Sequence, residues 1–135
     1  MLLVDTGVFV AAADRSEPRH ADCARLLRHR ADLTVVASVI PEAAWLVESR
    51  LGPAAEARLL ALVTSPRFTI VDLVSADYKR TIELIGTYAD LGLGFVDASV
   101  IAVAERLDQA TVATLNHRDF AVVRPAHRDA FELVP

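Results

Sequence analysis

The sequence predicts an α/β fold in which a mainly parallel sheet lies between two layers of helices. Short runs made only of apolar residues recur along the chain, as they do in strands that are buried on both faces. Longer segments with a helical spacing of apolar residues separate these runs. Because a helix that joins neighbouring parallel strands makes a right-handed crossover, this alternation indicates a three-layer α/β/α arrangement.

The elements of the first half of the chain are marked by boundary residues. A polar segment at residues 14–18 and the pair Gly52 and Pro53 interrupt the apolar pattern. Ser38 is placed to cap a helix that has Glu42 in its first turn. The expected elements are a strand at Leu2–Val4, helices at Val8–Ala13 and His20–Ala31, a strand at Thr34–Ala37, helices from Ser38 to Arg50 and over Pro53–Thr64, and a strand at Phe68–Val71.

In the second half, Ser75 is placed to cap a helix whose apolar residues recur at i, i+4, i+7 and i+11. These are Tyr78, Ile82, Ile85 and Ala89. The remaining expected elements are a loop at residues 92–94, a helix from Asp97 to Leu107, a strand at Thr111–Leu115, one helical turn at His117–Phe120 and a last strand at Phe131–Val134.

Length and composition indicate one domain over residues 1–135. The hydrophobic share of 53% exceeds the ordinary range, so we expect a partner to cover part of the surface. Cys23 is the only cysteine, which excludes a disulfide framework and a thiolate metal site. Asp5 interrupts the first apolar run and no uncharged stretch approaches the ~20 residues of a membrane helix, so the cytoplasm is expected. The net charge of −4 argues against binding nucleic acid by bulk charge but leaves local basic patches open.

Three carboxylates occur where predicted elements meet. Asp5 follows the first strand, Asp97 opens a late helix, and Glu42 lies in the first turn of an apolar helix. Strand ends and the helix starts that follow them meet at one edge of a parallel sheet, where α/β proteins bind ligands. Each carboxylate alone is also explained as a cap or as a charge that suits the helix dipole. Their expected convergence favours a shared acidic pocket.

Such a pocket requires a cation or a proton. Two carboxylates ~4 Å apart repel by about 4 kcal/mol at an effective dielectric constant of ~20. All the ligands on offer are oxygens, which favours Mg²⁺ or Mn²⁺ over Zn²⁺. An ion of this kind keeps water molecules that can become nucleophiles. The predicted reaction class is therefore hydrolysis of a phosphodiester.

Four segments carry a resemblance to a known family: residues 3–7 (LVDTG), 38–42 (SVIPE), 94–99 (GFVDAS) and 112–120 (VATLNHRDF). In their order and spacing they resemble the PIN-domain ribonucleases, specifically the VapC-type toxins of bacterial toxin–antitoxin pairs, over essentially the whole chain. The resemblance implies a PIN-like α/β/α fold and Mg²⁺- or Mn²⁺-dependent cleavage of RNA, such as tRNA or rRNA. It also implies a homodimer and neutralisation by a VapB-type antitoxin.

The resemblance implies roles for five of the residues. Asp5 and Asp97 resemble the principal metal ligands, and Glu42 completes the site, directly or through water. Thr6 and Ser38 would orient these carboxylates.

One position departs from the family pattern. The family often has a fourth acidic residue where this chain has Asn116, whose amide oxygen can bind a cation but carries no charge. Asp119, three residues later, is placed to compensate and is otherwise explained as a cap. This departure leaves open whether the site holds one metal ion or two.

Two further surfaces are predicted. Arg118, Arg124 and Arg128 form a basic patch that either contacts the RNA backbone or belongs to a solvated tail. The helix pair over residues 40–63 is too apolar for one buried stripe and is expected to include a groove for an amphipathic antitoxin segment. Its large apolar residues are Trp45, Leu46, Leu51, Leu59, Leu62 and Val63.

Two other functional classes share part of this pattern. A non-catalytic RNA- or antitoxin-binding PIN module is the main alternative, and the presence of all three core carboxylates argues against it. Phosphoryl-transfer enzymes also place an aspartate after their first strand. The dehalogenase type needs a second aspartate where this chain has Gly7, and the receiver type needs a late lysine, whereas the only lysine is Lys79.

Overall fold

A five-stranded sheet forms the centre of the computed structural model, which describes residues 1–135. The strand order is β3-β2-β1-β4-β5, and every neighbouring pair is parallel, so the predicted mainly parallel sheet is confirmed. Leu3 of the central strand pairs with Thr34 on one side and with Val112 on the other. The strands are β1 (Leu2–Val4), β2 (Leu33–Val36), β3 (Phe68–Val71), β4 (Thr111–Ala113) and β5 (Glu132–Val134).

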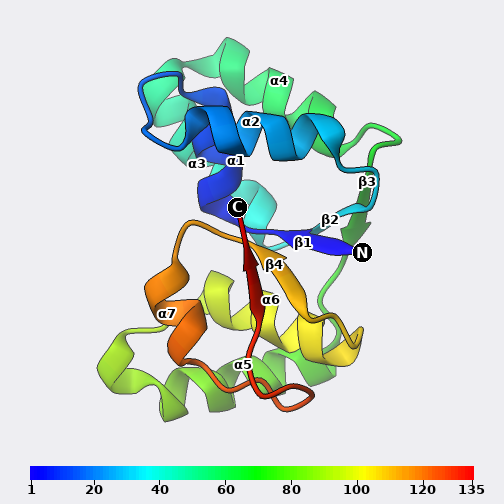
Figure 1. The fold of residues 1–135 in the computed structure, drawn as a ribbon, viewed down its shortest axis with the longest axis vertical. Helices are drawn as coiled ribbons and strands as arrows, with labels where there is room; N and C mark the ends of the chain where they lie inside the picture. The colour runs from blue at the N-terminus through cyan, green and yellow to red at the C-terminus, as the bar shows by residue number, and fades with distance from the viewer.

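Helices cover both faces of this sheet and make the predicted three layers (Figure 1). One layer contains α1 (Thr6–Ala13), α2 (His20–His29), α3 (Val39–Leu51) and α4 (Pro53–Val63). The other contains α5 (Ser75–Thr87), α6 (Phe95–Arg106) and α7 (His117–Val122), with a short 3₁₀ turn at Ala89–Leu91. None of the helices combines the length and apolarity that a membrane span requires.

The connections create a switch point between β1 and β4. After β1 the chain passes through the first helical layer to β2 and then β3, moving toward one edge of the sheet. It then returns through the second layer to β4, on the other side of β1. Crevices in open α/β sheets lie outside the carboxyl ends of the strands at such a reversal. The residues that follow β1 and β4 therefore flank the expected ligand site.

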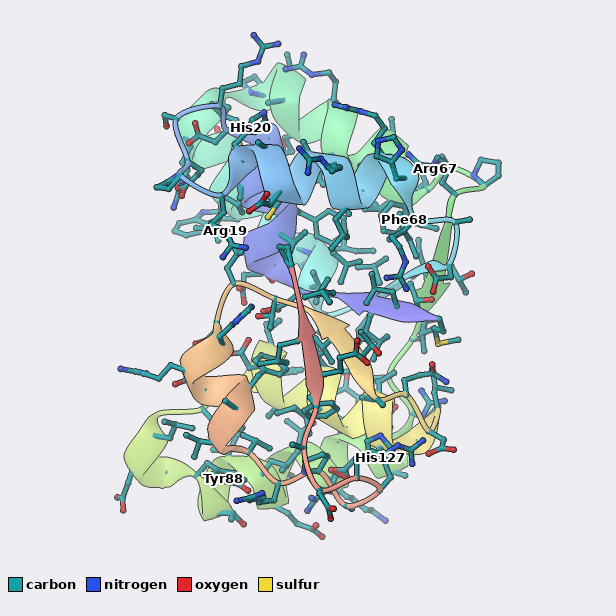
Figure 2. The ribbon with its side chains drawn as sticks, viewed as in Figure 1. Arg19, His20, Arg67, Phe68, Tyr88 and His127 are labelled. Atoms are coloured by element: carbon teal, nitrogen blue, oxygen red, sulfur yellow. The ribbon has the colours of Figure 1, made fainter.

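The core follows from the apolar runs. All three residues of β1 are buried, as expected of a central strand covered on both faces. Helix α6 is buried at every position from 98 to 104, and its alanines allow it to pack closely between the sheet and α5. Arg67 closes the end of α2, because its guanidinium donates to the carbonyl oxygens of Arg28 and Arg30 at 3.0 and 3.2 Å (Figure 2).

Three predicted helix starts are wrong. Helix α1 begins at Thr6, two residues before the predicted Val8, because Asp5 is its N-cap. Ser75 is the first helical residue of α5 rather than its cap, because Val74 is the N-cap and its amide donates to the Asp77 carboxylate at 2.9 Å. Helix α6 begins at Phe95, two residues before Asp97, so Asp97 lies in its first turn. The predicted strand at 111–115 ends at Ala113, since Thr114 turns its hydroxyl to Asp5.

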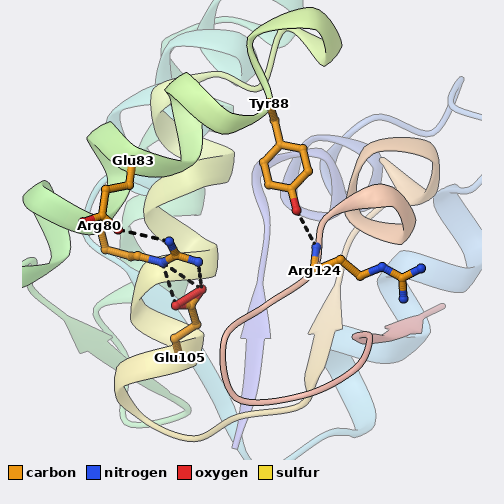
Figure 3. Close-up of polar contacts among 5 residues, drawn as sticks. All are labelled: Arg80, Glu83, Tyr88, Glu105 and Arg124. Atoms are coloured by element: carbon orange, nitrogen blue, oxygen red, sulfur yellow. Dashed lines mark hydrogen bonds and ion pairs between the residues drawn. The ribbon is translucent and has the colours of Figure 1, made fainter.

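The apolar spacing of α5 predicts the helix correctly, but its apolar residues face solvent. Ile82 is 70% exposed, whereas the buried residues of α5 are Asp77, Thr81 and Leu84, two of which are polar. Arg80 of α5 binds the Glu105 carboxylate of α6 at 2.8 Å (Figure 3), and Asp77 binds Arg106 at 3.0 Å. Charge pairs therefore join these two helices, and the apolar stripe remains available for another contact.

Candidate functional site

Asp5 anchors the site at the end of β1. The residue is 4% exposed, and its carboxylate accepts from the Thr6 backbone N–H at 2.8 Å and from the Thr114 hydroxyl at 2.9 Å. The residue is thus also the N-cap of α1, so capping and a place in the site coexist. Burial raises the pKa of Asp5, and the nearby Glu42 carboxylate adds to the rise, while the two hydrogen bonds oppose it.

Asp97 faces this carboxylate from the first turn of α6. Burial raises the pKa of Asp97 to about 7, and the negative charge of Asp5 is the next cause. Glu42 and Asp119 raise it further, whereas a hydrogen bond from Asn116 lowers it. Charges act on a pKa in this way only when they are close, so the fold brings these acidic residues together, as their positions in the sequence predicted.

Glu42 is the least restrained of the acidic residues. It lies half-buried in the first turn of α3 and its carboxylate makes no hydrogen bond or ion pair within the chain. Its charge nevertheless raises the pKa of both Asp5 and Asp97, which places it at the same pocket. Its oxygens are free to accept from a ligand or from water.

Asn116 joins two carboxylates instead of adding a third charge. Its amide nitrogen donates to Asp97 at 3.2 Å and to Asp119 at 3.0 Å, and its backbone N–H donates to the Thr114 hydroxyl at 3.0 Å. The pKa of Asp119 is lowered, first by the hydrogen bond from Asn116 and also by Arg118. Asp119 therefore contributes a stable negative charge at the pocket.

The two hydroxyl residues expected to orient the carboxylates differ in placement. The Thr6 hydroxyl is buried and has no hydrogen-bond partner within the chain. Ser38 occupies the N-cap position of α3 but neither caps the helix nor contacts a carboxylate. Its hydroxyl lies 2.6 Å from that of Ser99, which donates to the Val96 carbonyl at 2.7 Å. Ser38 thus ties α3 to α6.

Sequence reasoning missed Thr114 and Ser99. Thr114 donates to Asp5 and accepts from Asn116, so its hydroxyl links the ends of β1 and β4. Both residues lie inside the segments that carry the family resemblance, directly after a strand or two residues after Asp97. A hydroxyl at the end of a buried apolar strand is the signal that could have identified Thr114.

The predicted basic patch is divided by the fold. Arg118 is 82% exposed and binds the Asp119 carboxylate at 3.1 Å, so it lies beside the acidic pocket. The guanidinium of Arg124 binds the Asp129 carbonyl, and its backbone N–H donates to the Tyr88 hydroxyl (Figure 3). Arg128 pairs with Asp108. Asp108 precedes β4, so this pair lies at the amino ends of the strands, whereas the acidic pocket lies at their carboxyl ends.

The donor set fits a hard divalent cation. Carboxylate oxygens from Asp5, Asp97 and Glu42 gather at the pocket. The amide oxygen of Asn116, which the sequence offered as a ligand, instead accepts from the Asp119 backbone N–H at 3.5 Å. No three carboxylate, imidazole or thiol groups enclose an ion by themselves. An ion here would keep several of its waters, which is the coordination that Mg²⁺ favours.

A separate apolar groove of about 590 Å³ lies between α1, α2 and α4. Phe9, Leu27 and Leu59 contribute to its lining, and Arg28 and Arg58 contribute basic groups. Of the apolar residues predicted for an antitoxin groove, Leu59 and Leu62 line it. Trp45, at 66% exposed, and Leu51 lie outside it, and Val63 belongs to the core.

The sequence matches a known protein family and a known relative. The PIN domain family matches residues 2–124. Ribonuclease VapC26 of Mycobacterium tuberculosis is 28% identical over 135 residues, covering 99% of this chain and all of the relative.

Solved structures share the fold. The crystal structure of VapC20 of M. tuberculosis, a toxin that cleaves the sarcin–ricin loop, has a TM-score of 0.77 at 20% identity and covers 83% of this chain and 87% of its own. VapBC2 of Rickettsia felis, bound to a promoter DNA fragment, has a TM-score of 0.70 at 17% identity, covering 99% and 98%.

The raised pKa of Asp97 predicts how stability depends on pH in EDTA. Folded Asp97 holds its proton up to about pH 7, whereas the unfolded carboxyl loses it near 3.8. Its contribution is complete below the unfolded value and is lost as the pH rises through the folded one. The free energy of unfolding should fall by about 1–3 kcal/mol between pH 5 and 8, measured by urea denaturation.

The Asp97→Asn variant should lose this part of the pH dependence, and a matched change at exposed Asp90 should retain it. Parallel stability curves for the wild type and Asp97→Asn would contradict the assignment.

Proposed function

Because the chain belongs to the PIN-domain family, we propose that it is a metal-dependent endoribonuclease, the toxin of a VapBC-type toxin–antitoxin pair. The observation that carries the proposal is the group of mutually interacting carboxylates at the switch point between β1 and β4. The negative charge of Asp5 raises the pKa of Asp97 and so opposes its ionisation. A divalent cation would therefore stabilise the ionised pocket. The similarity to VapC26 supports RNA as the substrate.

Asp5, Asp97 and Glu42 would hold Mg²⁺ or Mn²⁺ in this proposal. When bound, such an ion polarises a phosphodiester and lowers the pKa of water. Thr114 and the Thr6 amide keep the Asp5 carboxylate in one orientation. The carboxylate of Glu42 has no partner within the chain and would complete the site directly or through water, while Asn116 holds Asp97 and Asp119 in place by donating to both.

The unrestrained Glu42 favours an enzyme over a non-catalytic binding module. A module that only binds RNA or an antitoxin has no use for a half-buried carboxylate without a partner, because burying a charge in this way costs stability. Arg118, exposed beside the pocket, is suited to contact the RNA backbone. We propose a structured RNA such as rRNA or tRNA as the substrate, which places the activity in the cytoplasm.

The α1-α2-α4 groove is our proposed docking site for the antitoxin. Its apolar floor suits one face of an amphipathic helix, and its arginines suit acidic residues at the margins of that helix. The VapBC2 structure is a toxin–antitoxin complex of the same fold, which supports a protein partner.

A second copy of the chain is a further proposed partner. Ile82 is exposed on α5 near Lys79 and Glu83, and residue 86 is a glycine with open space around its Cβ position. An antiparallel pair of α5 helices would bury Ile82 and bring the lysine of each copy near the glutamate of the other.

Asp5→Asn should reduce RNA cleavage at least 100-fold, because the amide cannot replace a charged ligand. The measurement is hydrolysis of bulk RNA with Mg²⁺. Adding EDTA to the wild type should reduce cleavage as much as the Asp5→Asn substitution does. Asp90→Asn is the matched control and should cleave as the wild type does. Cleavage that resists both Asp5→Asn and EDTA would refute the proposed metal site.

Arg58→Glu should weaken binding of the cognate antitoxin about tenfold, measured by calorimetry, because it reverses a charge at the groove. Arg124→Glu makes the same charge change outside the groove and should bind as the wild type does. Equal losses in the two variants would assign the effect to net charge and exclude the groove.

Ile82→Glu should convert a dimer to a monomer in light-scattering measurements of mass, because it places a charge in the apolar contact. Val122→Glu, at an exposed position of α7, is the control. A wild-type mass equal to one chain would refute the dimer.

A further inference from the structure

We propose that a second hollow, beside the acidic pocket, binds an unpaired nucleobase of the RNA substrate by stacking on an aromatic pair. The inference rests on the proposed ribonuclease function and adds a subsite to it. The hollow has a volume of about 540 Å³ and is lined by Ala37, Ser38, Asp72, Leu73, Tyr78 and Phe95.

The hollow and the acidic pocket lie along the same edge of the sheet. Ala37 and Ser38 follow β2, and Asp72 and Leu73 follow β3, whereas the carboxylates gather at the ends of β1 and β4. Neighbouring strands are ~4.8 Å apart, so the two sites lie within reach of one short stretch of RNA.

Two connections join their walls. Phe95 and Asp97 occupy the first turn of α6, so the ring and the carboxylate are carried by the same helical turn. Ser38 lines the hollow and its hydroxyl bonds to Ser99, also on α6, at 2.6 Å. The hollow is therefore held in place relative to the acidic pocket.

The aromatic pair has the geometry of a stacking platform. The rings of Tyr78 and Phe95 lie 6.2 Å apart between centroids with an angle of 13° between their planes, and the residues are 52% and 39% exposed. Single-stranded RNA is recognised by stacking of splayed bases on such rings. Both rings therefore remain partly open to solvent, although an apolar core was available to bury them.

Asp72 supplies the polar part of the hollow. Its carboxylate is exposed and makes no hydrogen bond or ion pair within the chain; only its backbone carbonyl is bonded, to Arg106. The carboxylate can accept from the amino or imino groups at the edge of a base. A base presenting such donors fits the hollow better than an apolar side chain does.

A second copy of the chain is the competing occupant. Tyr78 lies one turn before Ile82, but its ring turns sideways to stack on Phe95, whereas Ile82 is exposed to solvent. The carboxylate of Asp72 lines the hollow without a partner in the chain, and an apolar dimer contact would leave it unpaired. These observations favour RNA.

The test uses the full-length Asp5→Asn protein, so that RNA stays intact, and a short single-stranded RNA of mixed sequence that contains 2-aminopurine. Stacking should quench the fluorescence of this base. Phe95→Leu and Tyr78→Leu, each made in that background, should weaken binding about tenfold and reduce the quenching. Phe95→Tyr and Tyr78→Phe should preserve it, and Val122→Leu is the control outside the hollow.

Unchanged quenching in both leucine variants, or no quenching by the parent protein, would overturn the subsite. A change of mass in solution with intact quenching would assign the rings to a dimer contact instead. Chelator-sensitive cleavage of RNA by the wild type is scored separately. If that cleavage is present while the subsite fails, the proposed function stands; if it is absent, the proposed function fails.

Discussion

The link between the ends of β1 and β4 is the interaction on which the rest of the site depends. The Asp5 backbone N–H donates to the Ala113 carbonyl at 2.8 Å, and the Asp5 side chain accepts from Thr114 at 2.9 Å. Thr114 in turn accepts from the Asn116 amide, so one hydroxyl positions both the first carboxylate and the residue that bridges the other two. Because β1 and β4 lie on either side of the reversal in strand order, this link fixes the crevice and its ligands together.

The site opposes the stability of the fold that builds it. A buried carboxylate costs free energy unless it is paired, and here burial and like charge act in the same direction on Asp5 and Asp97. Burial of apolar side chains in β1, β4 and α6 around the pocket offsets this free-energy cost. Asn116 limits it further by donating to two carboxylates where a fourth acid would repel them. The ionised pocket is therefore destabilised by burial and by like charge, and a cation would offset both effects.

Much of the fold was predictable because its signals are local. The apolar runs that became β1, β2 and β3 and the helical spacing of α3, α4 and α5 are properties of neighbouring residues. The errors arose where a side chain found a distant partner. Ser38 bonds to Ser99 instead of capping its own helix, and Thr114 leaves the strand pattern to bond Asp5. The apolar face of α5 was identified by its spacing, but its orientation depends on the ion pairs with α6.

The sequence by itself determined the element types, the parallel sheet and the acidic residues at element boundaries. These features depend only on residues that are close together in the chain. Only the tertiary structure decided which side chains share a pocket. Arg118 lies beside Asp119, whereas Arg128, in the same sequence patch, lies at the amino ends of the strands with Asp108. The stacking of Tyr78 on Phe95 likewise joins α5 to the start of α6. The order of strands sets these distances, and that order follows from the packing of the whole chain, which no short segment encodes.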